Sequence, residues 1–175
     1  MPENRPKAYI DTMIFIYYTS SSNELGRKSN AFLQDIENGK YIGVVATNTI
    51  AEYLAVVKKI RFKRTRKQLS SGDIDKILSD LEMLIQDLGI AVYDADELVI
   101  NNFGKSTLFS EVEDLIRSMP CNIGIRDNKV HTLCGADAMS IVFATHIGAD
   151  LFATFDDDFR NVKNKIKPLM VWEEY

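Results

Sequence analysis

The segment GADAMSIVFATHIGADLFATFDDDF, residues 135–159, limits the fold more than any other part of the chain. It predicts an apolar helix over 136–147, a stop at Gly148 and a buried strand over 151–154. A helix of about 11 residues is roughly 16 Å long, and an extended run of about six residues covers roughly 18 Å. The two lengths match, so the returning strand brings Asp156 back to the level of Asp137.

The rest of the chain alternates between apolar, β-rich runs and helical patterns. Strands are predicted at residues 8–11 (AYID), 41–47 (YIGVVAT), 90–94 (IAVYD) and 168–172 (PLMVW). Helices are predicted at TMIFIYYT after the first strand, at 24–38, from Thr47 or Thr49 as cap into the basic segment, at 73–88, and over much of 95–118. Such alternation is typical of βαβ units and predicts an α/β fold with a mainly parallel sheet.

One segment does not follow the alternation. Residues 119–134, MPCNIGIRDNKVHTLC, are long for a loop in a compact domain. IGI and VHTL on either side of RDNK predict a small hairpin there. We therefore expect one domain over residues 1–175, with a hairpin insertion at about 120–134.

The composition is that of a soluble cytoplasmic protein, with 46% hydrophobic and 26% charged residues in a chain of 175. The two cysteines, Cys121 and Cys134, are too few for a disulfide framework and suit a reducing cytosol. The first residues lack the apolar run of a signal peptide, and no run reaches the roughly 18 residues of a membrane span. We expect no membrane association.

Four acidic residues from distant parts of the chain are expected at one edge of the sheet. Asp11 ends the first strand, and Glu52 lies in the first turns of the helix after strand 41–47. Strand ends and the starts of the following helices share an edge of a parallel sheet, where α/β proteins place their sites. Asp137 and Asp156 belong to the same edge. Singly, such acids also fit helix starts or a solvated turn, so the shared edge is what favours a site.

Carboxylates gathered in this way repel one another and either take up protons or bind a cation. No set of His and Cys accompanies them, as zinc would require, and all-oxygen sites suit Mg²⁺ or Mn²⁺. Such an ion can activate water and neutralise charge on a phosphodiester, with one ion or two. In the leading hypothesis, Asp11, Asp137 and Asp156 hold the metal, while Glu52 holds metal or orients the attacking water.

These acids and their surroundings resemble the PIN-domain nucleases, named after the PilT N-terminus, and among them the VapC-like toxins of toxin–antitoxin pairs. The matching motifs are YIDT, TNTIAEYL, GADA and TFDDDF, and the likeness extends from about residue 8 to 172. The resemblance implies a three-layer α/β/α sandwich with a five-stranded parallel sheet and metal-dependent cleavage of RNA. It implies homodimers and, for toxins, an antitoxin partner. It also implies catalytic, metal-binding roles for Asp11, Glu52, Asp137 and Asp156, with Asp158 as accessory acid and Thr154 as polar neighbour.

Residues 58–67, KKIRFKRTRK, carry seven positive charges and no negative ones, although the chain has a formal net charge of −4. Such a run could follow an RNA backbone, meet an acidic partner such as an antitoxin tail, or form a solvated helix face. Its charged members are Lys58, Lys59, Arg61, Lys63, Arg64, Arg66 and Lys67.

Other functions stay open at this level. A phosphatase-like fold would use Asp11 as nucleophile, but Met13 stands where that fold wants a second Asp. A receiver domain would want an acid pair after the first strand, whereas the acids here concentrate near the other end. A PIN-like module that binds RNA or protein without cutting is one alternative, and a nuclease for RNA maturation or decay is another.

Overall fold

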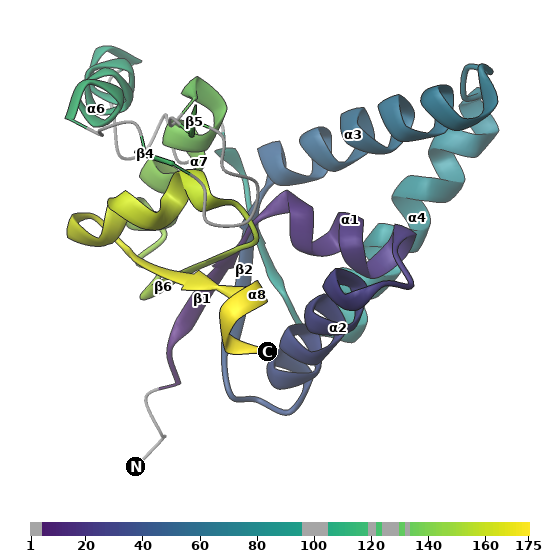
Figure 1. Cartoon of the computed structure of the whole chain (residues 1–175), viewed down its shortest axis with the longest axis horizontal. Coiled ribbons are helices and arrows are strands. Elements are labelled where there is room, and N and C mark those ends of the chain that lie inside the picture. Colours follow the sequence, from purple (N-terminus) through teal and green to yellow (C-terminus); the bar gives the residue numbers. More distant parts are fainter. Residues whose placement is uncertain (1–4, 96–104, 119–121, 124–129, 132–133) are drawn as a thin grey trace.

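The computed structural model describes residues 5–95, 105–118, 122–123, 130–131 and 134–175. Five strands form one sheet in the order β3-β2-β1-β6-β7, and every neighbouring pair is parallel. The strands are β1 (Lys7–Ile10), β2 (Ile42–Ala46), β3 (Ala91–Tyr93), β6 (Leu151–Thr154) and β7 (Lys167–Met170). The expected α/β fold with a parallel five-stranded sheet is confirmed, and β1 lies at its centre (Figure 1).

Helices cover both faces of the sheet because successive strand residues point to opposite sides. Ala8 and Ile10 of β1 pack into a core with four helices: α1 (Thr12–Ser20), α2 (Glu24–Glu37), α3 (Thr47–Thr65) and α4 (Ser71–Asp87). Tyr9 faces the other core, with α6 (Lys105–Ser118), α7 (Gly135–His146) and the 3₁₀ helix η1 (Asp157–Asn164). There its ring stacks on Phe152 of β6 at 5.2 Å. Figure 1 shows the two groups of helices on the two sides of the sheet.

The order of the strands reverses between β1 and β6. From β1 the chain first builds the sheet outward through β2 and β3, and it later adds β6 and β7 on the other side of β1. The backbone N–H of Asp11 donates to the carbonyl of Ala153 at 3.0 Å across this junction. Ligands of open α/β sheets bind outside the carboxyl ends of the strands at such a switch point. The ends of β1 and β6 are therefore where a site is expected.

Two local predictions were wrong. Ala46 rather than Thr47 or Thr49 is the N-cap of α3, because β2 runs directly into the helix and leaves no side-chain cap. The last strand ends at Met170, and residues Val171–Glu174 form the short helix α8 instead of continuing to 172. Met170 pairs with Thr154, the last residue of β6, so the strand has no neighbour to pair with beyond that point.

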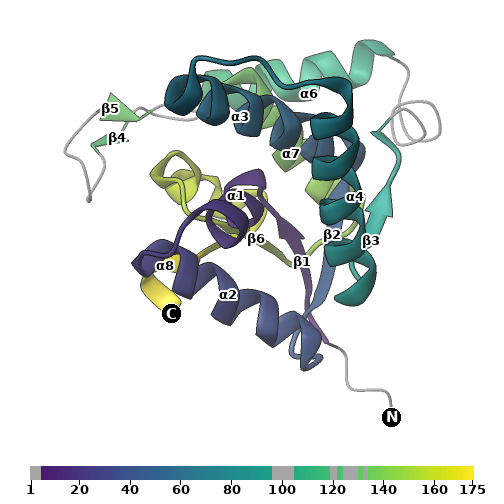
Figure 2. The same cartoon turned by 90° about the vertical axis from the view of Figure 1, so that its right-hand side faces the viewer.

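An antiparallel pair occurs where the hairpin was predicted. Strand β4 (Asn122–Ile123) pairs with β5 (Val130–His131), with Ile123 opposite Val130. The expected turn RDNK lies outside the described residues. Figure 2 shows this pair at the upper left, apart from the five-stranded sheet. No helix in the described ranges has the length and apolar character needed to cross a membrane.

Candidate active site

Asp11 follows the last residue of β1 and is the N-cap of α1, where its side chain makes no capping hydrogen bond. The side chain is half-buried and instead accepts a hydrogen bond at Oδ2 from the Thr154 hydroxyl at 2.7 Å. Thr154 is fully buried at the end of β6. The carboxylate of Asp11 is therefore fixed across the switch point between the two central strands.

The surroundings of Asp11 are strongly unfavourable for a negative charge. Burial raises the pKa of this carboxyl from 3.8 to about 7, against the opposing effect of the Thr154 hydrogen bond. The negative charges of Glu52, Asp137 and Asp156 make smaller contributions to this rise in pKa. The structure thus brings Glu52, Asp137 and Asp156 within electrostatic reach of Asp11 at the carboxyl edge of the sheet.

Glu52 reaches this edge from the first turns of α3, where its side chain is exposed. Its Oε2 accepts a hydrogen bond from the hydroxyl of Thr12 at 2.7 Å. Thr12 is buried and opens α1 directly after Asp11. The Asp-Thr pair in YIDT therefore serves both acids: Asp11 supplies one carboxylate, and Thr12 orients another. Thr12 was not among the predicted site residues, although its place beside Asp11 in the motif was a signal.

Asp137 is the third residue of α7 and has two roles. Its Oδ2 accepts a hydrogen bond from the backbone N–H of Cys134 at 3.2 Å, which forms a capping box at the start of the helix. Burial raises the pKa of Asp137, the hydrogen bonds from Cys134 lower it, and the charge of Asp156 raises it. The residue thus caps the helix, as a single acid at this position would, and also belongs to the acidic group.

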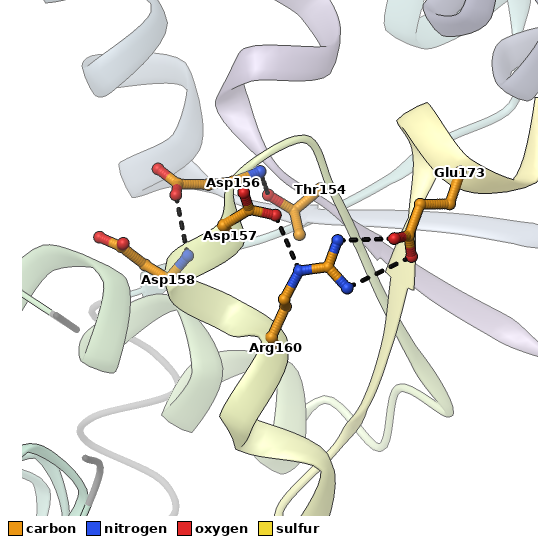
Figure 3. Close-up of polar contacts among 6 residues, drawn as sticks. All are labelled: Thr154, Asp156, Asp157, Asp158, Arg160 and Glu173. Carbon is orange, nitrogen blue, oxygen red and sulfur yellow. Dashed lines mark hydrogen bonds and ion pairs between the residues drawn. The ribbon is translucent and has the colours of Figure 1, made fainter. Parts of the chain in front are cut away.

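The three consecutive aspartates after β6 do not share one role. The hydroxyl of Thr154 accepts from the backbone N–H of Asp156 at 3.0 Å, and Asp156 Oδ1 accepts from the backbone N–H of Asp158 at 2.9 Å. Figure 3 shows the carboxylates of Asp156 and Asp158 directed to one side and that of Asp157 to the other. Thr154 therefore connects Asp11 and Asp156 through one oxygen, and the backbone of Asp158 holds the Asp156 carboxylate. The role of Asp158 as accessory acid stays a prediction.

Asp157 is structural. Its side chain is 1% exposed and pairs with Arg160 Nε at 2.8 Å. The same guanidinium pairs with Glu173 of α8 at 2.6 Å and lies over the Trp172 ring at 4.9 Å. Figure 3 shows Arg160 between the two carboxylates. This network fixes the turn that carries Asp156 and Asp158. The sequence pattern alone did not distinguish the middle aspartate from its neighbours.

A family model for the PIN domain matches residues 8–165, a range that includes all four acids. The chain belongs to the PIN domain family. PIN domains are generally nucleases and typically use divalent metal ions. The comparison with curated proteins gives no match, so the narrower VapC-like assignment stays a prediction from the motifs.

The acids of this PIN domain suit a hard divalent cation. All candidate ligands are carboxylate oxygens. Burial first, and then the charges of neighbouring acids, raise the pKa values of Asp11 and Asp137, and a bound cation would favour the ionised form of both. Among the residues that the structure describes, no three His, Cys, Asp or Glu side chains are grouped tightly enough to hold a metal ion as they stand. Mg²⁺ is usually held by one or two carboxylates and keeps several waters, so the donor set fits this type of ion.

The predicted basic residues do not gather at the acids of the PIN domain. Helix α3 continues without a break into the basic run and ends at Thr65, and its C-cap Arg66 has a left-handed backbone with φ of 59°. Figure 1 shows α3 leaving the upper end of the sheet and running outward until it turns back into α4. The seven residues are exposed and lie toward the far end of this helix: Lys58, Lys59, Arg61, Lys63, Arg64, Arg66 and Lys67.

Proposed function

We propose that this PIN domain is an Mg²⁺- or Mn²⁺-dependent endoribonuclease. Asp11, Asp137 and Asp156 would hold the metal, and Glu52 would hold it or orient the attacking water. The observation that carries the proposal is the meeting of four acids at the switch point: Thr154 fixes the Asp11 carboxyl at 2.7 Å, and the charges of Glu52, Asp137 and Asp156 act on it. A protein gains nothing in stability from a partly buried carboxylate beside three others, whereas a cation-dependent reaction requires such a group.

The chemistry is hydrolysis of a phosphodiester: water attacks phosphorus, and the bond to the leaving oxygen breaks. Bound Mg²⁺ or Mn²⁺ would lower the pKa of a water and neutralise charge on the phosphate. The hydroxyls of Thr154 and Thr12 hold Asp11 and Glu52 in fixed orientations. In its alternative role as base, Glu52 accepts the proton of the attacking water. Asp158, next to Asp156, adds negative charge that strengthens attraction of the cation.

Two biological roles are compatible with the proposed nuclease activity. As a toxin, the protein would form homodimers and be silenced by an antitoxin. As a maturation or decay enzyme, it would need no such partner. A small open reading frame next to the gene that encodes an antitoxin would favour the toxin. The presence of all four acids favours either enzyme over a PIN-like module that binds without cutting.

The decisive experiment is cleavage of a labelled structured RNA with Mg²⁺, with Mn²⁺ and with EDTA. We expect cleavage with either metal and none with EDTA. Asp137→Asn is expected to lower the rate by more than about 100-fold, because even outer-shell residues of metal sites cost about 10- to 100-fold. Asp75→Asn makes the same chemical change at an exposed residue of α4, and it should cut like the wild type.

Two outcomes of this assay would contradict the proposal. Cleavage that persists in EDTA and in Asp137→Asn would indicate a contaminating ribonuclease. Absence of cleavage by folded wild-type protein with both metals, over a set of single-stranded and structured RNAs, would favour the binding module.

Thr154→Val is expected to shift the pH dependence of cleavage. The Thr154 hydroxyl lowers the pKa of Asp11, so its loss raises that pKa, and protons compete more strongly with the metal. We expect kcat/KM to fall most at and below about pH 7, where the variant holds the proton on Asp11 more often, and to recover at higher pH. A profile of kcat/KM against pH measures this shift. A loss of equal size at every pH would mean that Thr154 serves only packing, and thermal melts would check folding.

A further inference from the structure

Helix α3 connects the acidic edge with the basic run along one face. Glu52 lies near its start, and Lys59 and Lys63 follow by seven and eleven positions. These spacings are close to two and three whole turns at about 3.6 residues per turn, so the three side chains lie in one row. At a rise of about 1.5 Å per residue, the lysines lie roughly 10 and 17 Å from Glu52 along the helix.

The two lysines of this row carry uncompensated charge. Both are exposed, and in the described part of the chain neither side chain has a hydrogen bond or salt bridge. Arg61 differs from them, because it lies half a turn away from the row and pairs with Asp73 of α4 at 3.6 Å. The row thus places two unpaired lysine charges on the same face of α3 as Glu52.

An aromatic ring accompanies the row. Phe62 follows Lys59 by three positions, which makes the two side chains neighbours on the helix surface. The Phe62 side chain is 40% exposed, although it is one of the most apolar side chains in the segment. Cations that contact a backbone, together with an exposed ring on which a base can stack, are the features by which proteins hold single-stranded nucleic acids.

We propose that Lys59, Phe62 and Lys63 hold a single-stranded segment of the substrate RNA to one side of the bond that is cut. A stacked strand advances about 3.4 Å per nucleotide, so the contacts would lie roughly three to five nucleotides from the cut. The position of the cut rests on the proposed nuclease function, whereas the RNA contact itself can be tested without cleavage. An acidic protein segment would use the lysines equally well but gives no reason for the row to begin at the catalytic acids.

Binding is measured in an Asp137→Asn background, which separates it from cutting. The probe is a fluorescent single-stranded RNA of about 12 nucleotides, and anisotropy is recorded between about 50 and 200 mM salt. Lys59→Gln with Lys63→Gln is expected to lower affinity about tenfold and to reduce the slope of log K against log salt by about 1.4, or about 0.7 for each phosphate contact on a single strand.

Two further variants separate stacking on Phe62 from a general effect of lost positive charge. Phe62→Ala is expected to lower affinity and leave the salt slope unchanged, since stacking releases no counterions. The matched control is Arg27→Gln with Lys76→Gln, which removes the same charge from exposed residues of α2 and α4. It should retain both the affinity and the slope.

Cleavage by the otherwise wild-type protein tests the distance. Each substrate would extend past the cut by about two nucleotides on one side and about eight on the other, or by about two on both sides. About two nucleotides are too few to reach the row, which is expected roughly three to five nucleotides away, and about eight are enough. For the wild type, we expect a longer extension on one of the two sides to raise kcat/KM about tenfold. The double variant Lys59→Gln with Lys63→Gln should lose this increase and should cut the short substrate at the wild-type rate.

The outcomes separate this inference from the nuclease proposal. RNA binding that shows the expected dependence on the row, without cleavage, would refute the nuclease and support the row. Equal RNA binding by the row variant and its matched control would overturn the inference. So would binding of a polyglutamate peptide that depends on Lys59 and Lys63 while RNA binding does not, because the row would then serve an acidic protein. Equally tight binding of duplex RNA that is independent of Phe62 would overturn the single-stranded assignment.

Discussion

Replacing Asp11 with Asn is expected to stabilise the metal-free protein at neutral pH and to abolish cleavage of RNA. Burial and the charges of Glu52, Asp137 and Asp156 raise the pKa of Asp11 from 3.8 to about 7. At 1.36 kcal/mol per pKa unit, the ionised side chain lowers the free energy of unfolding by at most about 4 kcal/mol. Asn removes the charge and keeps an oxygen that can accept the hydrogen bond from Thr154.

The gain in stability should depend on pH in a defined direction. Below about pH 4 the carboxyl is protonated in the folded and unfolded chains, so Asn and Asp differ little. Between about pH 4 and about pH 7 the unfolded chain loses the proton while the folded chain keeps it, and the wild type becomes less stable. Above about pH 7 both states are ionised, and the full advantage of Asn persists.

Urea unfolding of wild type and Asp11→Asn in EDTA, at about pH 4 and about pH 8, measures this difference. Mn²⁺ should narrow the difference in the free energy of unfolding between the two proteins. A ligand at 100 times its Kd stabilises the folded wild type by about 2.7 kcal/mol, and the variant should gain much less. Asp75→Asn on α4 serves as the control that responds to neither pH nor metal in this way. A variant that is less stable than wild type at pH 8 in EDTA would refute the unfavourable placement of the Asp11 charge.

Replacing Arg160 with Met is expected to lower the free energy of unfolding by about 3–5 kcal/mol, because it removes the ion pair of a buried charge. That charge belongs to Asp157, which is 1% exposed and pairs with Arg160 at 2.8 Å. Met retains much of the aliphatic stem of Arg160 but removes the guanidinium, which lies over the Trp172 ring. The turn that carries Asp156 should also lose its fixed geometry, so cleavage should fall together with stability.

Two companion variants test this reason. Glu173→Gln removes the other partner of Arg160, but Glu173 is partly exposed, and exposed ion pairs usually contribute less than about 1 kcal/mol. Asp157→Leu combined with Arg160→Met removes both charges of the buried pair, and it should recover much of the lost stability. A cost for Arg160→Met no larger than that for Glu173→Gln, by urea unfolding, would show that Asp157 does not depend on its partner.

The meeting of the four acids could be predicted because it follows from lengths and order in the chain. The helix and strand after residue 135 have matching lengths, and parallel strands place their carboxyl ends at one edge. Those two constraints are enough to bring Asp137 and Asp156 to the end of β1, where Asp11 stands. Whether these acids hold a metal stays a prediction, because that depends on oxygen positions to a fraction of an ångström.

Other features depend on contacts that local pattern does not contain. Strand propensity favours Val171 and Trp172 as β residues, but β6 ends at Thr154, and a strand without a neighbour gains no ladder hydrogen bonds. The separate role of Asp157 depends on Arg160 and on Glu173 of α8. The hydrogen bond from Thr12 to Glu52 joins residues 40 positions apart. Each of these features appears only after the sheet is assembled.

The central position of β1 has a consequence for the order of folding. Its neighbour β2 follows soon along the chain, but the contact between Thr154 and Asp11 joins residues 143 positions apart. Closing such a long loop is slow compared with forming the local helices and hairpins of a chain. The acids are therefore complete only after β6 has docked beside β1, which belongs to the slowest steps of folding. A partly folded chain would keep its carboxylates apart and would lack the site proposed for the cation and for cleavage.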